Sequence, residues 1–203
     1  MMAIHRVFIS YHHDKDQWAK EYLLKLNDKN NIFIDGSIDI GDIDETLPDK
    51  IIREKIRDEY LKDTTVTILL VGVETKNRKH IDWELYSSMY DGKKNKKSGI
   101  LVIQLPSINP KYITAAHGTE EKKHIYPSIQ NWISIDSREE FEKRYPYLPD
   151  RIIDNLLKME SKISVVKWSE LTADSLRLLI ELTFNDRENC KYDMSRPMRK
   201  SNS

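Results

Sequence analysis

The stretch TTVTILLVG, residues 64–72, decides the fold class. Its residues are almost all apolar or β-branched, which is the pattern of a parallel strand covered by helices on both faces. Shorter runs of similar character occur at residues 6–11 (RVFISY), 31–34 (NIFI) and 99–105 (GILVIQL). The segments between these runs repeat apolar residues at four-residue steps, as amphipathic helices do; these residues are Trp18, Tyr22 and Leu26, then Ile52, Ile56 and Tyr60, then Ile81, Leu85 and Met89. Four β–α units in a row predict an α/β fold with a doubly wound parallel sheet of about five strands.

The second half of the chain predicts additions to this sheet. We expect a long loop or insertion over residues 106–130 and a fifth strand at residues 131–135 (NWISI), which completes a domain of residues 1–136. Residues 137–188 are expected to form C-terminal helices packed on the same domain, because Ser137 and Glu140 have capping-box spacing. Within them ISVVKW (163–168) is strand-like, and residues 173–187 are amphipathic. Residues 189–203 are polar, and we expect a disordered tail.

The composition argues against several classes of partner. The chain has 203 residues with 33 acidic and 33 basic side chains, so no overall charge attracts it to nucleic acid or to an anionic membrane. Its single cysteine, Cys190, forms no internal disulfide, and no Cys/His cluster has the spacing of a metal site. The start lacks the apolar region of a signal peptide, and no run approaches the ~20 apolar residues of a membrane span. We therefore expect a cytoplasmic protein without a metal or a bound cofactor.

Glu84 is the candidate catalytic residue, within NRKHIDWELYSS (77–88). An acid early in a helix has an ordinary explanation, because the helix dipole favours it. The functional alternative rests on position. In a doubly wound sheet the ligand crevice lies at the carboxyl ends of the strands, where this helix is expected to begin. The adjacent Trp83 would then shield part of the acid from water.

Two further segments follow predicted strands. In SYHHDKD (10–16), Ser10, Tyr11 and the amides that open the helix are suited to a phosphate or a ribose, because helix N-termini favour anions; a capped polar loop is the alternative. The acid-rich DGSIDIGDID (35–44) lacks the spacing of a calcium loop and is expected to be a mobile loop over the crevice. The chain contains no GxGxxG, GxxxxGK[ST] or GxSxG motif, which removes the common nucleotide-binding and hydrolase signatures.

Taken together, RVFISYHHDKD, VTILLVGVETKNRKHIDWEL and GILVIQL resemble the TIR (Toll/interleukin receptor) domain, over roughly residues 5–105. They are most similar to the bacterial TIR-like branch that includes the ThsB subunit of the Thoeris anti-phage system. The most specific part of the resemblance is the spacing of Gly72, Thr75, Asn77, Arg78 and Glu84. The chain departs from many TIR domains at His80, where they place a tryptophan. The resemblance implies a flavodoxin-like sheet.

The resemblance also implies an enzyme that cleaves the bond between nicotinamide and ribose in NAD. Its product would be a cyclic ADP-ribose isomer or an ADP-ribose conjugate that activates a separate effector protein, and self-association is common in such domains. Glu84 is then catalytic, and NAD is a substrate. The residues expected to bind this substrate are Ser10, Tyr11, His12, Asp35, Ser37, Asn77 and Trp83. The alternatives are a non-catalytic TIR adaptor, which docks on other proteins, and a flavodoxin-like module that binds a flavin or another nucleotide.

Overall fold

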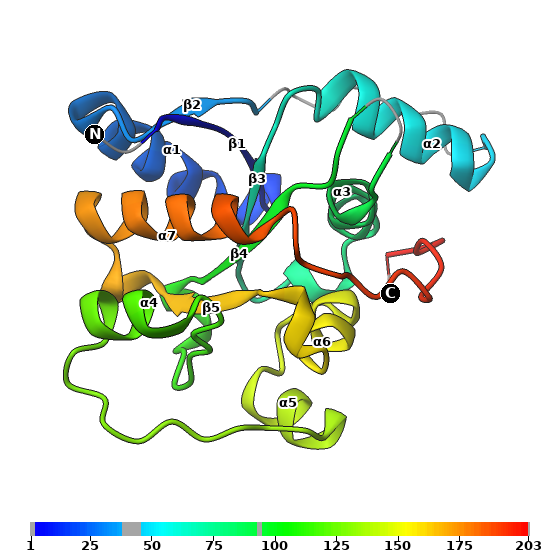
Figure 1. Ribbon diagram of the computed structural model, residues 1–203. Helices are drawn as coiled ribbons and strands as arrows, with labels where there is room; N and C mark the ends of the chain where they lie inside the picture. Colours follow the sequence, from blue (N-terminus) through cyan, green and yellow to red (C-terminus); the bar gives the residue numbers. More distant parts are fainter. Residues whose placement is uncertain (1–2, 38–45, 93–94, 203) are drawn as a thin grey trace.

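The computed structural model describes residues 3–37, 46–92 and 95–202, and its centre is a five-stranded parallel sheet (Figure 1). The strand order is β2-β1-β3-β4-β5, and each neighbouring pair is parallel. The strands are β1 (His5–Ser10), β2 (Phe33–Asp35), β3 (Val66–Val71), β4 (Gly99–Gln104) and β5 (Ser164–Lys167). This order is the flavodoxin-like one, so the predicted doubly wound sheet is confirmed.

Helices connect the strands and cover both faces of the sheet. They are α1 (His13–Asn30), α2 (Asp49–Lys55), α3 (Lys79–Met89), α4 (Gly118–Ile125), α5 (Arg138–Arg144), α6 (Asp150–Leu156) and α7 (Ala173–Asp186). Single turns of other helix types are η1 (Ile56–Tyr60), η2 (Thr75–Asn77), η3 (Pro106–Ile108), η4 (Met159–Ser161) and η5 (Trp168–Glu170). The predicted helices of the C-terminal half are therefore present, and Ser137 caps α5 by accepting a hydrogen bond from the backbone N–H of Glu140.

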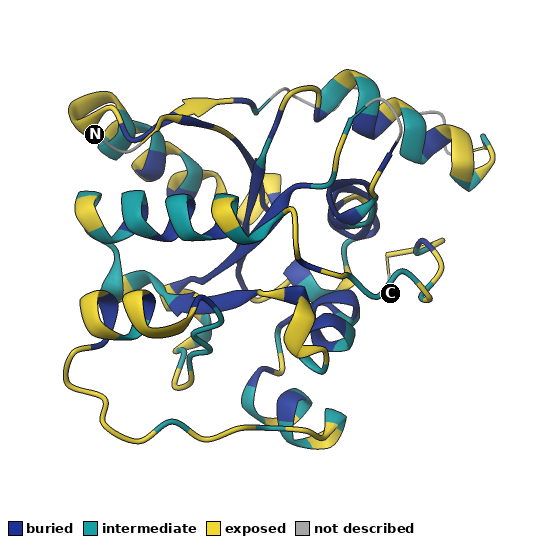
Figure 2. Cartoon of the chain, viewed as in Figure 1, coloured by how far each residue is buried: buried dark blue, intermediate teal, exposed yellow. Residues whose placement is uncertain are grey.

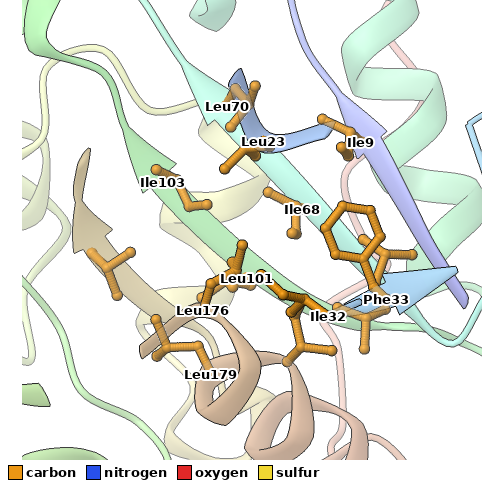
Figure 3. Packing of buried hydrophobic residues seen from close by; sticks show 14 of the residues in the cluster. Ile9, Leu23, Ile32, Phe33, Ile68, Leu70, Leu101, Ile103, Leu176 and Leu179 are labelled. Atoms are coloured by element: carbon orange, nitrogen blue, oxygen red, sulfur yellow. The ribbon is translucent and has the colours of Figure 1, made fainter. Parts of the chain in front are cut away.

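The core has two main layers because successive residues of a strand point to opposite faces. In β3, Ile68 and Leu70 pack toward α1 and α7, in the cluster of Figure 3, whereas Leu69 and Val71 pack toward α3 and α6. All residues of β3 and β4 are buried. Burial on both faces is the physical reason that TTVTILLVG is apolar without alternation.

The α1 helix buries a different face from the one that its large apolar residues suggest. Ala19 and Leu23 are fully buried against the sheet, whereas Trp18 and Tyr22 are 45% and 47% exposed. Both aromatic rings lie with their centroids 5.2 Å from that of Trp168 in η5. The small Ala19 side chain suits close approach to the sheet, and the bulky rings lie beside the neighbouring turn.

The predicted position of the fifth strand was wrong. Residues 131–135 are irregular, and Ile133 is 74% exposed. The edge next to β4 is instead occupied by β5, whose Val165 and Val166 are fully buried. ISVVKW provides this strand because its apolar residues are covered on both sides, so the segment predicted to add helices also completes the sheet. Residues 106–130 likewise contain η3 and α4 rather than one long loop.

The prediction of a disordered tail was also wrong for residues 189–202, which pack along α3 and α6 (Figure 1). Cys190 and Met198 are buried. The fully buried guanidinium of Arg151 donates hydrogen bonds to the backbone carbonyls of Arg196 and Pro197, each at 3.0 Å. A polar segment becomes ordered here because a buried cation binds its backbone.

Candidate functional site

The candidate site lies where the strand order reverses, between β1 and β3. In doubly wound sheets this switch point opens a crevice at the carboxyl ends of the strands. Ser10 is the last residue of β1, and α3 follows β3 through η2. The two elements meet directly, because the Ser10 hydroxyl Oγ donates a hydrogen bond to Glu84 Oε2 at 2.5 Å. The structure thus joins two residues that are 74 positions apart in the chain.

Glu84 is deeply buried rather than placed on a polar rim. Only 4% of the residue is exposed, and α3 is buried on almost every side (Figure 2). The helix contacts β1 and β4, η1, α2 and α6. Glu84 also lies beyond the first turn of α3, which begins at Lys79. Because the helix dipole acts mainly within the first turn, it does not explain an acid at this position.

Burial changes the acidity of this carboxyl group. Loss of solvation raises the pKa of Glu84 to about 8, and the hydrogen bond from Ser10 and the charge of Lys20 offset part of the rise. The carboxyl is therefore mainly protonated at neutral pH in this state. A nearby cation would readily convert it to a carboxylate. Strong perturbation of a carboxyl pKa is typical of functional sites.

The connection between β3 and α3 fixes the position of Glu84. The fully buried Thr75 accepts a hydrogen bond at its Oγ1 from the backbone N–H of Gly72, at 2.9 Å. A Cβ atom on residue 72 would overlap the carboxylate of Asp16 from α1. Glycine at 72 and threonine at 75 therefore have a structural reason, because they allow the chain to turn closely against α1.

Asp16 of α1 lies against Gly72, at the same edge of the sheet, and was not among the predicted site residues. It is 4% exposed, and burial raises its pKa, with the charge of His12 lowering it and that of Glu74 raising it. His12 is also buried, with Nε2 lying 3.2 Å from Glu74 Oε2 but outside hydrogen-bond geometry. In the sequence Asp16 resembles an ordinary acid of a first helical turn. Its burial against Gly72 depends on the packing of α1.

Tyr11 links the end of β1 to α1. Its hydroxyl donates a hydrogen bond to Gln17 Oε1 at 2.6 Å, and Lys20 Nζ lies 5.2 Å from the centroid of its ring. Lys20 is the cation that stabilises the ionised form of Glu84. Tyr11 is buried, so little of its side chain is open to a ligand in this structure.

Asp35 and Ser37 lie at the carboxyl end of β2, beside β1. The Ser37 hydroxyl accepts a hydrogen bond from the backbone N–H of Ile9 at 3.2 Å, and the Ser37 N–H donates one to Asp35 Oδ1 at 2.9 Å. The predicted loop over the crevice continues into residues 38–44, which lie outside the described residues.

A comparison with protein-family models identifies the family of the part of the chain that carries this site. A family model described as Thoeris protein ThsB, TIR-like domain, matches residues 8–110, which is just over half of the chain and includes Ser10 and Glu84. The chain belongs to this ThsB TIR-like family. No curated protein and no solved structure matches the chain.

Two other residues expected to bind substrate, Trp83 and Asn77, have different surroundings. Trp83 is 3% exposed and donates a hydrogen bond from Nε1 to the carbonyl oxygen of Arg199 at 2.8 Å. Consecutive residues of a helix point about 100° apart, so Trp83 faces the C-terminal segment while Glu84 faces β1. Asn77 is exposed in η2. Their binding roles stay predictions.

Across residues 3–37, 46–92 and 95–202, no three His, Cys, Asp or Glu side chains come together as a metal site. Within that part of the chain, no helix has both the length and the apolar composition needed to cross a bilayer.

Proposed function

We propose that this protein is a cytoplasmic NAD-cleaving enzyme of the Thoeris type in bacterial anti-phage defence. It takes NAD as a substrate, uses no resident cofactor and releases nicotinamide. The remaining ADP-ribose is cyclised or joined to an acceptor, and this product activates a separate effector protein. Membership of the ThsB TIR-like family supports the proposal. The observation that carries it is the buried carboxyl of Glu84, bonded to Ser10 at the switch point of the sheet.

The chemistry requires one negative charge near the ribose. The nicotinamide of NAD is a cationic leaving group, which departs as the neutral base with the electron pair of the broken C1′–N bond. The ribose then becomes oxocarbenium-like, and a carboxylate beside it lowers the energy of the transition state. A nucleophile adds at C1′ and loses its proton, and its identity as water, an acceptor or another atom of the same molecule decides the product.

The environment of Glu84 suits this role. Charges interact more strongly where water is excluded, so a carboxylate at a buried position stabilises a nearby cation more than an exposed one does. The cationic substrate would itself favour the ionised form of Glu84, whose pKa of about 8 lies close to neutral. In this proposal the ribose hydroxyls bind the Glu84 carboxylate, and the Ser10 hydroxyl holds its second oxygen in place.

The test is the release of nicotinamide by wild type and Glu84→Gln. Concentrated purified protein is incubated with NAD, and phage-infected cells that produce each variant are extracted and analysed by mass spectrometry. We expect Glu84→Gln to remain folded and to release nicotinamide at least about 100-fold more slowly than wild type, because the amide side chain cannot become negatively charged. Glu59→Gln, at an exposed acid of η1, is the matched control and should retain full activity.

Two outcomes would contradict the catalytic proposal. Equal nicotinamide release by Glu84→Gln and wild type would remove Glu84 from the chemistry. A wild-type protein that releases none, both when purified and in infected cells, would favour the non-catalytic adaptor instead.

A further inference from the structure

A second candidate site lies at the β5 edge of the sheet, away from Ser10 and Glu84. It is a cavity of about 560 Å³, lined by residues of three segments, 111–118, 129–135 and 156–163, together with Lys122, Phe141 and Arg144. Figure 1 shows the chain between α4 and α5 swinging outward below β5, where it forms the outer wall. All lining residues lie beyond residue 110, where the match to the ThsB TIR-like family ends. The size is within the range of small-molecule sites.

The lining of this cavity has a strong charge bias in a chain with no net charge. It includes no acidic residue, and its five basic residues are Lys111, Lys122, Arg144, Lys158 and Lys162. Two of them have partners outside the lining, since Arg144 binds Glu140 at 2.6 Å and Lys158 lies 3.3 Å from Asp193. Within the described part of the chain, Lys111, Lys122 and Lys162 form no ion pair. The cavity is therefore suited to an anion.

Aromatic rings lie beside these cations. Lys122 Nζ is 4.7 Å from the ring centroid of Trp132, and the guanidinium of Arg144 is 5.1 Å from that of Tyr112. Both rings line the cavity, and Tyr112 is 42% exposed. Such pairs offer a planar ligand a stacking surface next to a positive charge.

The outer wall has unused hydrogen-bonding groups. Residues 131–135 are irregular, and no hydrogen bond joins their backbone to any residue in the described part of the chain. Ile133 and Met159 add exposed apolar surface at the rim, because Ile133 is 74% exposed and Met159 is 86% exposed. Apolar walls with a few converging polar groups are typical of small-molecule sites.

We propose that this cavity binds a phosphorylated small molecule with a planar aromatic ring, of the nucleotide class. Lys111, Lys122 and Lys162 hold the phosphate groups, and Trp132 and Tyr112 contact the ring. The site is independent of the proposed NAD cleavage, because its residues belong to the β5 edge and not to the carboxyl ends of β1 and β3.

The test is calorimetric titration of the full-length protein with ADP as the probe. Combined Lys111→Glu and Lys162→Glu should weaken ADP binding by at least about tenfold, because charge-assisted contacts to phosphate are lost. The matched control is combined Lys25→Glu and Lys62→Glu, which makes the same change of charge at two exposed lysines elsewhere. Trp132→Ala should weaken ADP binding while leaving the weaker binding of pyrophosphate unchanged. Circular dichroism checks the fold of each variant.

Three results would overturn the proposal. The first is that wild type does not bind ADP at a concentration of about 1 mM, which corresponds to a weak dissociation constant. The others are equal ADP affinity in the Lys111/Lys162 variant and its control, and unchanged ADP affinity in Trp132→Ala. Each differs from a failure of nicotinamide release, which is measured separately.

Discussion

At the scale of single residues, the protonation of Glu84 is the central property. Burial raises its pKa to about 8, and Ser10 and Lys20 only partly offset this. A helix dipole would have lowered the pKa instead. The environment of Glu84 therefore disfavours the charged form of its carboxyl group, and a bound cation would offset this effect.

The pH dependence of activity should report this pKa. If the carboxylate form of Glu84 is the active one, kcat/KM for NAD should rise about tenfold per pH unit below pH 8 and level off above it. Initial rates of nicotinamide release between pH 6 and pH 9 measure the profile. A flat profile over this range would show that ionisation of Glu84 does not limit the reaction.

Stability should respond to the same titration with a defined sign. The pKa of Glu84 rises from 4.5 to about 8 on folding, so the folded state binds more protons between these values. The contribution of Glu84 to stability is therefore fully present below pH 4.5 and declines as the pH rises through 8. Relative to wild type, Glu84→Gln should become more stable with rising pH, by on the order of a few kcal/mol at pH 9. Urea denaturation at pH 5 and pH 9 measures this, and a pH-independent difference would contradict it.

At the scale of elements, α3 is held in place by α6 through a buried ion pair. Arg151 of α6 donates hydrogen bonds to both carboxylate oxygens of Asp82, from Nε at 2.8 Å and from one terminal nitrogen at 3.0 Å. Asp82 Oδ2 also accepts a hydrogen bond from the backbone N–H of Arg199 at 2.8 Å. The helix that carries Glu84 is thus bonded to two other segments.

Breaking this pair should be costly. Arg151→Ala leaves the buried carboxylate of Asp82 without its cation and should lower the free energy of unfolding by about 3–5 kcal/mol. Arg177→Ala is the control, because its ion pair with Asp174 is near the surface and should contribute less than about 1 kcal/mol. Urea denaturation of both variants measures the difference. Equal losses would mean that the buried pair does not stabilise α3.

At the scale of the whole molecule, the C-terminal segment completes the packing around α3. Met198 of this segment belongs to the same buried cluster as Trp83. The carbonyl oxygen of Arg199 accepts a hydrogen bond from the indole N–H of Trp83. Asn202 Oδ1 also accepts a hydrogen bond from the backbone N–H of Lys79, at the start of α3. Residues more than 100 positions apart thus share one packed unit.

Removal of residues 189–203 should therefore destabilise the protein and its proposed site together. Exposure of Trp83 and loss of the partners of Arg151 should lower the melting temperature by roughly 10 °C and reduce nicotinamide release. Differential scanning calorimetry and the NAD assay measure the two effects. A truncated protein that melts at the wild-type temperature would show that the segment is not part of the folded unit.

The fold class was predictable because its cause is local. Strands that are covered on both faces must be apolar throughout, and that pattern is visible in TTVTILLVG and its neighbours. The edge strand was harder, because both NWISI and ISVVKW are plausible strands by composition. ISVVKW is the segment that pairs with β4, and the paired residues are about 60 positions apart in the chain.

The sequence by itself determined the alternation of strands and helices, and the position of Glu84 in the helix after the central strand. Both depend on spacing along the chain, which local periodicity reveals. Only the tertiary structure decided that Glu84 is buried against Ser10, that Asp16 lies against Gly72 and that residues 189–202 pack on α3. Burial depends on which segments surround a side chain, and those segments come from distant parts of the sequence.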